Sequence, residues 1–183
     1  HDLKLPRMLH GAILRTDRVH ARILKIDTAA AERLAGVRAV ITGADIDNVA
    51  FGNGRDNTPL KEDKVYCIRD EIAAVAAESE EIAREAASLI QVGYEDLPPI
   101  FTPEEAMAEG AALIHEDKGS NLLRTYRYSH GELAEGERSS DVIVEGSYQL
   151  PSVTHCCLGT CGIVATFDSS GDLTLYSVTQ VPF

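Results

Sequence analysis

The hydrophobic pattern changes along this chain of 183 residues, and that change restricts its fold more than any other feature. Over the first hundred residues, short apolar runs of strand length alternate with segments of helical periodicity. After Gly131, the pattern is that of alternating strands separated by turns. Mixed units followed by a hairpin-rich tail predict the α+β class rather than a doubly wound parallel sheet.

Apolar runs and helix-end signals predict a strand, helix, strand unit near the start. Strands are expected at 9–14 and 21–26, joined by a polar loop. Thr28 can cap a short Ala-rich helix, and Gly36 is placed to end it in the left-handed conformation that glycine adopts readily. A buried strand at 37–41 is expected to follow.

The segment 42–64 is rich in Asp, Asn and Gly, which is typical of a long irregular loop. Its length suggests a functional or interface role, and a mobile surface loop is the alternative. Strands are predicted at 65–68 and 72–77, and Ser79 is expected to begin an amphipathic helix. The next strand is expected at 92–94.

The later part of the chain has one helix-start signal and three strand patterns. Residues 102–105 form the pattern of a capping box with proline at the first helical position, which predicts a second short helix. Strands are expected at 142–150, 163–167 and 173–178, with a turn at 168–172. The last third of the chain is therefore predicted to be mostly antiparallel sheet.

Acidic side chains outnumber basic ones by 29 to 17, which gives a formal net charge of -12. Such a surface repels phosphate backbones and anionic lipids, so we expect no nucleic acid and no membrane as a partner. No apolar run approaches the roughly 20 residues of a membrane span, and residues 1–6 lack the apolar core of a signal peptide. We therefore expect a cytoplasmic protein, and the absence of an initial Met predicts a fragment of a longer one.

The charge is distributed unevenly. Residues 1–69 carry 12 basic and 9 acidic side chains, whereas residues 70–183 carry 5 and 20. An acidic solvated face explains this difference, and a surface for a separate partner is the alternative.

Three of the four cysteines and one histidine lie within seven residues, at His155, Cys156, Cys157 and Cys161. In a strand, only His155, Cys157 and Cys161 could share a face. Thiols that are buried or line a pocket explain the cluster best. A metal site, a disulfide and a nucleophilic cysteine with a histidine partner are the alternatives. The residues alone give no complete catalytic site, because no acid/base pair of carboxylates and no phosphate-binding glycine loop can be singled out.

Five segments of the first hundred residues resemble, in the same order, the start of the molybdenum-bearing large subunit of the xanthine dehydrogenase and aldehyde oxidase family. They are LHGAILR at 9–15, HARI at 20–23, AGVRAVIT at 35–42, DEIAAVAAE at 70–78 and VGYEDLP at 92–98. Several linked segments are more specific than any single motif. The resemblance implies an α/β-hammerhead domain over 1–125, followed by the first strands of a molybdopterin-binding domain over 126–183.

The second of these domains departs from the family pattern at one point. The family usually shows an acidic residue after a histidine and a few apolar positions, where this chain has LGT at 158–160. The segments VTHCCLGT at 153–160 and SVTQVPF at 177–183 look most like those of 4-hydroxybenzoyl-CoA reductases. That subfamily is therefore the expected one.

The resemblance implies two sets of site residues. Gln180 matches the glutamine that lies beside the molybdenum and donates a hydrogen bond to one of its oxygen ligands. His155, Cys156 and Cys157 are expected to line the substrate pocket. The glycine-rich cofactor loop and the late catalytic Glu of the family are expected beyond Phe183, so these 183 residues should hold no catalytic residue and should be inactive alone.

Cofactors and partners also follow from the resemblance. Molybdopterin with molybdenum is expected in the full-length subunit, and iron-sulfur clusters and FAD on partner subunits or domains, in an oligomer of heterotrimers. The reductase would remove the ring hydroxyl of 4-hydroxybenzoyl-CoA to give benzoyl-CoA in aromatic degradation. An electron-rich phenol resists reduction, so a low-potential metal relay must supply the electrons.

Three other functions are the alternatives. The first is a molybdenum hydroxylase of the xanthine dehydrogenase and aldehyde oxidase type. The second is a stand-alone hammerhead interaction domain that binds a partner through its acidic second half. The third is a thiol or metal protein that uses Cys156, Cys157 and Cys161.

Overall fold

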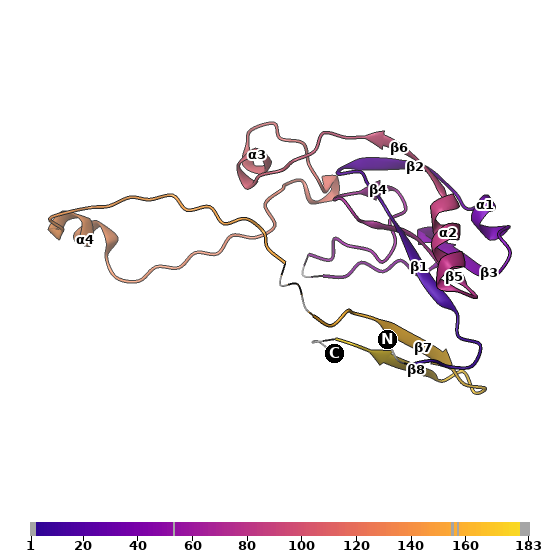
Figure 1. Cartoon of the computed structure of the whole chain (residues 1–183). Coiled ribbons are helices and arrows are strands. Elements are labelled where there is room, and N and C mark those ends of the chain that lie inside the picture. The colour runs from indigo at the N-terminus through magenta and orange to yellow at the C-terminus, as the bar shows by residue number, and fades with distance from the viewer. Residues whose placement is uncertain (1–2, 53, 155, 157, 180–183) are drawn as a thin grey trace. The chain divides into compact units, whose positions relative to one another are not determined.

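The computed structural model describes residues 3–52, 54–154, 156 and 158–179 (Figure 1). They divide into two compact units, one formed by Pro6–Tyr126 and the other by described residues within 1–5 and 127–183. We call them the first and the second unit. No helix in the described part of the chain is long and apolar enough to cross a bilayer.

The first unit contains a three-stranded antiparallel sheet in the order β1-β5-β3. Its strands are β1 (His10–Arg15), β3 (Val37–Thr42) and β5 (Glu71–Ala77). Val75 of the central strand lies opposite Ala12 on one side and Val40 on the other. The expected strands at 9–14, 37–41 and 72–77 are thus confirmed.

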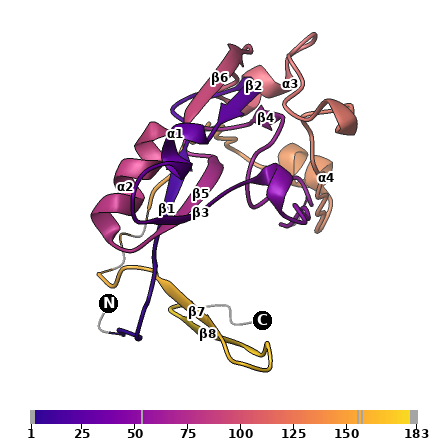
Figure 2. The ribbon, with the colours of Figure 1, turned by 90° about the vertical axis from the view of Figure 1, so that its right-hand side faces the viewer.

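Two helices pack against this sheet, α1 (Ala29–Glu32) and α2 (Glu80–Leu89), as Figure 2 shows. The Ser79 side chain accepts a hydrogen bond from the backbone N–H of Ile82 at 3.3 Å, so the expected cap of α2 is present. Gly36 follows α1 with φ +90°, as predicted. The main core is formed by mostly small side chains of α1, α2 and β5 and by Ile90 after α2. Its buried members are Ala31, Ala73, Val75, Ala86, Ala87 and Ile90.

A second sheet has the order β4-β2-β6. Its strands are β2 (Ala21–Asp27), β4 (Lys64–Val65) and β6 (Gln91–Asp96). Ala21, Val65 and Ile72 form a small core beneath it. The predicted strand at 65–68 is wrong beyond Val65, because the carboxylate of Asp70 accepts the N–H groups of Tyr66 and Cys67 and turns the chain there.

The segments between and after these strands are held by local hydrogen bonds. A 3-10 helix, η1 (Gly43–Asp45), starts the long loop, and an isolated bridge pairs Phe51 with Asn57. The helix α3 (Pro103–Met107) begins with the predicted capping box, in which Thr102 and Glu105 each accept a backbone hydrogen bond. A further 3-10 helix, η2 (Glu116–Lys118), ends at Gly119.

The second unit holds a two-stranded antiparallel hairpin, β7 (Ile163–Phe167) with β8 (Leu173–Ser177). The turn between them is stabilised by Asp168, whose carboxylate accepts hydrogen bonds from Ser170 and Asp172. This confirms the hairpin expected near the end of the chain. A short helix, α4 (Leu133–Ser139), precedes it and was not predicted.

Residues 142–150 form no strand, which corrects the sequence-based expectation for this segment. Their alternation of apolar and polar side chains suits a strand, yet Val144, Tyr148 and Leu150 are each about nine-tenths exposed. A strand needs a neighbour for its backbone hydrogen bonds and a surface for its apolar face. The described residues around this segment supply neither, so the last third of the chain is not mostly sheet.

Candidate functional site

Three of the four predicted site residues, His155, Cys157 and Gln180, lie outside the described residues. Cys156 is exposed and has φ +42°, a left-handed conformation that few residues other than glycine adopt. The assigned roles of all four, in the substrate pocket or beside the molybdenum, stay predictions.

The described side chains of the second unit are open to solvent. From 127 to 179, every side chain that the structure describes is exposed or half-buried. Ile163, Phe167, Leu173 and Leu175 lie on one face of the hairpin and are each more than half exposed. The described residues of this unit therefore form no closed cradle for a pterin by themselves.

Cys161 is also exposed. Over the ranges that the structure describes, no three His, Cys, Asp or Glu side chains are grouped so that they could hold a metal ion. The proposed thiol cluster includes residues outside those ranges, so its role stays open.

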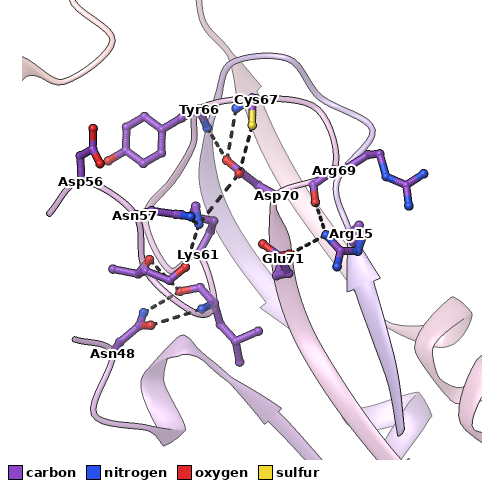
Figure 3. Close-up of polar contacts among 12 residues, drawn as sticks. Arg15, Asn48, Asp56, Asn57, Lys61, Tyr66, Cys67, Arg69, Asp70 and Glu71 are labelled. Atoms are coloured by element: carbon purple, nitrogen blue, oxygen red, sulfur yellow. Dashed lines mark hydrogen bonds and ion pairs between the residues drawn. The ribbon is translucent and has the colours of Figure 1, made fainter. Parts of the chain in front are cut away.

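The first unit contains a polar cluster between the loop 43–63 and the turn before β5, which we call the Lys61 cluster (Figure 3). Its members are Asn48, Asn57, Lys61, Cys67 and Asp70, of which Lys61 and Asp70 are buried and Cys67 is exposed. Lys61 is 2% exposed, and its ammonium donates hydrogen bonds to Asn57 Oδ1 at 2.5 Å and to the carbonyl of Thr58 at 2.9 Å. The Asp70 carboxylate lies 3.9 Å from it. A buried ammonium without such partners would be costly, so these contacts fix the loop around it.

Asp70 connects the cluster to the turn before β5. Its carboxylate accepts hydrogen bonds from the N–H groups of Tyr66 at 2.7 Å and Cys67 at 3.2 Å. The Cys67 thiol donates to Asp70 Oδ1 at 3.3 Å. Burial, followed by this hydrogen bond and the carboxylate charge, raises the pKa of Cys67 to about 11. The thiol is therefore protonated at neutral pH and is a poor nucleophile.

The side chain of Asn48, near the start of the loop, is hydrogen-bonded to the backbone of Leu60 near its end. Its side-chain amide donates to the Leu60 carbonyl at 2.6 Å and accepts from the Leu60 N–H at 3.3 Å. A Cβ at Gly43 would lie 3.0 Å from Asn48 Nδ2 and 3.2 Å from the Leu60 carbonyl oxygen, so the loop packs closely there. The described residues of the loop are thus held by hydrogen bonds at several points.

A second set of contacts, which we call the Lys64 seam, joins β4 to the segment 112–121. The ammonium of Lys64 donates to Glu116 Oε2 at 2.9 Å and to the Ile114 carbonyl at 2.8 Å. The rings of Tyr66 and His115 stack at 4.4 Å between centroids. The hydrogen bond from Lys64 lowers the pKa of Glu116 below its ordinary value.

Neither set of contacts forms a catalytic arrangement. The Cys67 thiol donates to a carboxylate and its pKa is raised, and the ammonium groups of Lys61 and Lys64 each donate to two oxygen atoms of the chain. Both sets serve to position the loop and the segment 112–121. Sequence reasoning did not single out Lys61 or Lys64, since only the length of the loop pointed to a role there.

Two family models match the chain. The model described as "Aldehyde oxidase and xanthine dehydrogenase, a/b hammerhead domain" matches residues 1–98. The model described as "Molybdopterin cofactor-binding domain" matches residues 114–183. The chain is therefore a mixed α/β structure with a hammerhead domain and the start of a molybdopterin-binding domain, as the family resemblance implied.

Two curated relatives are similar along nearly the whole chain. A probable subunit of xanthine dehydrogenase from Bacillus subtilis (strain 168) is 41% identical over 181 residues, which are 98% of this chain and 24% of that protein. The "Nicotinate dehydrogenase large molybdopterin subunit" of Eubacterium barkeri is 32% identical over 186 residues, which are 99% of this chain and 43% of that protein.

A solved structure agrees in fold. The quinoline 2-oxidoreductase of Pseudomonas putida 86 is 35% identical, with a TM-score of 0.88 over 99% of this chain and 24% of that one. The chain thus spans from about a quarter to less than half of the length of these relatives. With more than half of its residues matched by the hammerhead model, the chain belongs to the aldehyde oxidase and xanthine dehydrogenase family, as part of a molybdopterin-binding large subunit.

Proposed function

We propose that the chain is a segment of a molybdenum hydroxylase that oxidises a nitrogen-containing aromatic ring. The observation that carries this proposal is chemical. The names of the three relatives refer to xanthine, nicotinate and quinoline, each of which is an aromatic compound with nitrogen in its ring, whereas other relatives of comparable similarity are named for carbon monoxide or for aldehydes. The alternative function predicted above, a hydroxylase of the xanthine dehydrogenase type, agrees with these names.

The role of this segment in such an enzyme is to provide part of the framework. When bound by the complete subunit, a molybdenum cofactor supplies two-electron chemistry at a ring carbon. The Lys61 cluster and the Lys64 seam hold the hammerhead loop and the segment 112–121 in place. Gln180 stays the proposed donor to an oxygen ligand of molybdenum, and His155, Cys156 and Cys157 stay the proposed pocket residues, on the family resemblance alone.

A 4-hydroxybenzoyl-CoA reductase is the second candidate. It is favoured by one feature, the LGT at 158–160 where the family usually has an acidic residue. The three relatives described above favour the hydroxylase instead. We rank the reductase lower for that reason.

The assembly and the domain boundary are also proposals. We propose iron-sulfur and FAD partners in an oligomer of heterotrimers, and a boundary between 125 and 126. We also propose that the 183-residue chain alone is inactive, because the family resemblance places the glycine-rich cofactor loop and the late catalytic Glu beyond Phe183.

The test uses the complete subunit expressed with its partner subunits. We expect oxidation of xanthine, nicotinate or quinoline with a dye as electron acceptor, with the new oxygen atom coming from ¹⁸O-labelled water. Enzyme produced with tungstate in place of molybdate is the control and should be inactive. Conversion of 4-hydroxybenzoyl-CoA to benzoyl-CoA with a strong reductant, without activity on the three heterocycles, would overturn the hydroxylase proposal in favour of the reductase.

A further inference from the structure

A groove of about 460 Å³ lies in the first unit between β2 and β3. Residues 23–26 of β2 line one side, Val40 and Thr42 of β3 line the other, and Glu62 and Asp63 of the long loop lie at its end. Neither the Lys61 cluster nor the Lys64 seam accounts for this groove. Its outline combines two strand edges with a strongly acidic rim.

Both strands leave backbone groups that no strand pairs along the groove, while the Thr42 N–H of β3 donates to the Asp45 carboxylate at 2.8 Å. In the β1-β5-β3 sheet, β3 is an edge strand. On the other side, β4 pairs with β2 only at Ala21 and Arg22, and the Ile23 N–H donates to the Asp63 carbonyl at 2.8 Å. Among the described residues, no strand pairs with β2 on that side beyond Ile23. Unpaired edges are the places where an extended segment of another polypeptide adds to a sheet.

The rim carries four carboxylates, from Glu32, Asp45, Glu62 and Asp63. The only ammonium among the lining residues belongs to Lys25, which is bound to the carboxylate of Asp27 at 2.7 Å. In the described part of the chain, the side chains of Glu62 and Asp63 form no ion pair and are exposed. The groove therefore attracts basic side chains and repels acidic ones.

Leu24 adds an apolar contact at the same place, because it lines the groove and is 66% exposed. A strand alternates its side chains between two faces. A segment that alternates basic and apolar residues would thus offer one set of side chains to the carboxylates and the other to Leu24.

We propose that this groove binds an extended, basic segment of a partner polypeptide by strand addition to β2 or β3. A second copy of this chain is a poor occupant, because the net charge of -12 and the acidic rim repel another copy. A single metal ion is also a poor occupant, since the described residues group no three suitable ligands there and the space greatly exceeds one ion.

The first experiment measures binding of a capped hexapeptide of alternating lysine and valine to the full 183-residue chain by calorimetry and by amide hydrogen exchange. We expect slower exchange for amides of β2 or β3 when the peptide is bound. The same peptide with alternate backbone amides methylated should bind at least tenfold more weakly, because it cannot complete a ladder of hydrogen bonds. Equal binding of the methylated peptide would overturn strand addition.

The second experiment reverses the charge of two carboxylates at the rim of the groove. The double variant Glu62→Lys/Asp63→Lys should weaken binding of the lysine-valine peptide at least tenfold. The matched control is Glu85→Lys/Glu109→Lys, which changes the net charge equally at two exposed residues that do not line the groove. The control should bind within twofold of the parent chain.

Absence of measurable binding of the lysine-valine peptide would overturn the proposal, and so would either of two further results. Equal weakening by both double variants would show that the peptide responds only to overall charge. Sedimentation of the unliganded chain as a dimer, with β3 amides already protected, would assign the groove to a second copy of this chain.

Discussion

The two units of this chain differ in how far each one buries its own side chains. Every fully buried residue that the structure describes lies between Thr16 and Ile90, in the first unit. In the second unit, the apolar face of the β7–β8 hairpin is open, and the described residues contain no buried side chain. The first unit can therefore fold around its own core, whereas an isolated hairpin is marginal in water.

The two units also differ in the burial of charged side chains. The first unit buries two lysines and an aspartate, and each is paired by groups of the same unit. The acidic side chains of the second unit stay in solvent, for example Asp168 in the hairpin turn. Buried charges are tolerated only where the surrounding chain is fixed, so they mark the part of the molecule that is rigid by itself.

The largest effect on the stability of the first unit is expected when the buried ammonium of Lys61 is removed. Lys61→Met should lower the free energy of unfolding of the first unit by about 3 kcal/mol, because Asp70 is left as a buried charge without its cation. Urea unfolding followed by hydrogen exchange of β5 amides measures this. Lys25→Met is the control, since Lys25 is 72% exposed and its pair with Asp27 should contribute less than about 1 kcal/mol. Similar losses in both variants would contradict the assigned role of the Lys61 cluster.

Matched truncations in the two units test the difference in packing. Val75→Ala should destabilise the first unit by about 2 kcal/mol, because Val75 is 3% exposed in the main core. Leu175→Ala should change stability by no more than about 0.5 kcal/mol, because Leu175 is 53% exposed. Thermal and urea unfolding of both variants give the comparison. A cost for Leu175→Ala as large as that for Val75→Ala would mean that the hairpin has a core of its own.

One substitution should increase the stability of the first unit and so enlarge its difference from the second unit. Arg69 precedes Asp70 with φ +73°, and its backbone is held by hydrogen bonds with Thr16 and Arg15. Arg69→Gly should stabilise the first unit by about 0.5–1 kcal/mol, because glycine adopts this conformation without steric cost. Arg33→Gly is the control and should destabilise, since Arg33 has an ordinary φ of -81°. The midpoints of urea unfolding of the two variants measure this difference. A loss of stability in Arg69→Gly would contradict the inferred backbone strain at Arg69.

The smallest effect is expected at the Lys64 seam. The hydrogen bond from Lys64 lowers the pKa of Glu116, so its stabilising contribution is complete above the ordinary value of 4.5 and is lost as the pH falls through the lower, folded value. Ring signals of Tyr66 and His115 should lose their mutual contacts in acid. We expect Glu116→Gln to remove the part of this change that follows the carboxyl titration, whereas Glu109→Gln should leave it intact. An identical acid profile in the two variants would exclude Glu116 as the titrating group.

Most elements of the first unit could be predicted because their signals are local. The Ser79 cap, the Thr102 capping box and the left-handed Gly36 each act within a turn of the chain. Apolar periodicity located β1, β3 and β5 for the same reason, since side chains two residues apart share a face of a strand. The family resemblance then supplied the domain type, which periodicity alone does not give.

The candidate site was less predictable. The loop 42–64 was recognised by its composition. Its conformation depends on the buried Lys61, and the sequence does not distinguish a buried lysine from a solvated one. The segment 142–150 shows the opposite error. Its pattern fits a strand, and the structure gives it no neighbour with which to pair.

The sequence by itself determined most of the helices and strands in the first unit, where the hairpin turns, and to which family the chain is similar. The tertiary structure alone decided that Lys61 and Lys64 are buried, that β4 ends after two residues, and that β2 and β3 leave edges beside an acidic groove. The physical reason is distance along the chain. Lys64 meets Glu116 across 52 positions, and the energy of a buried charge depends on such remote partners, which no local pattern contains.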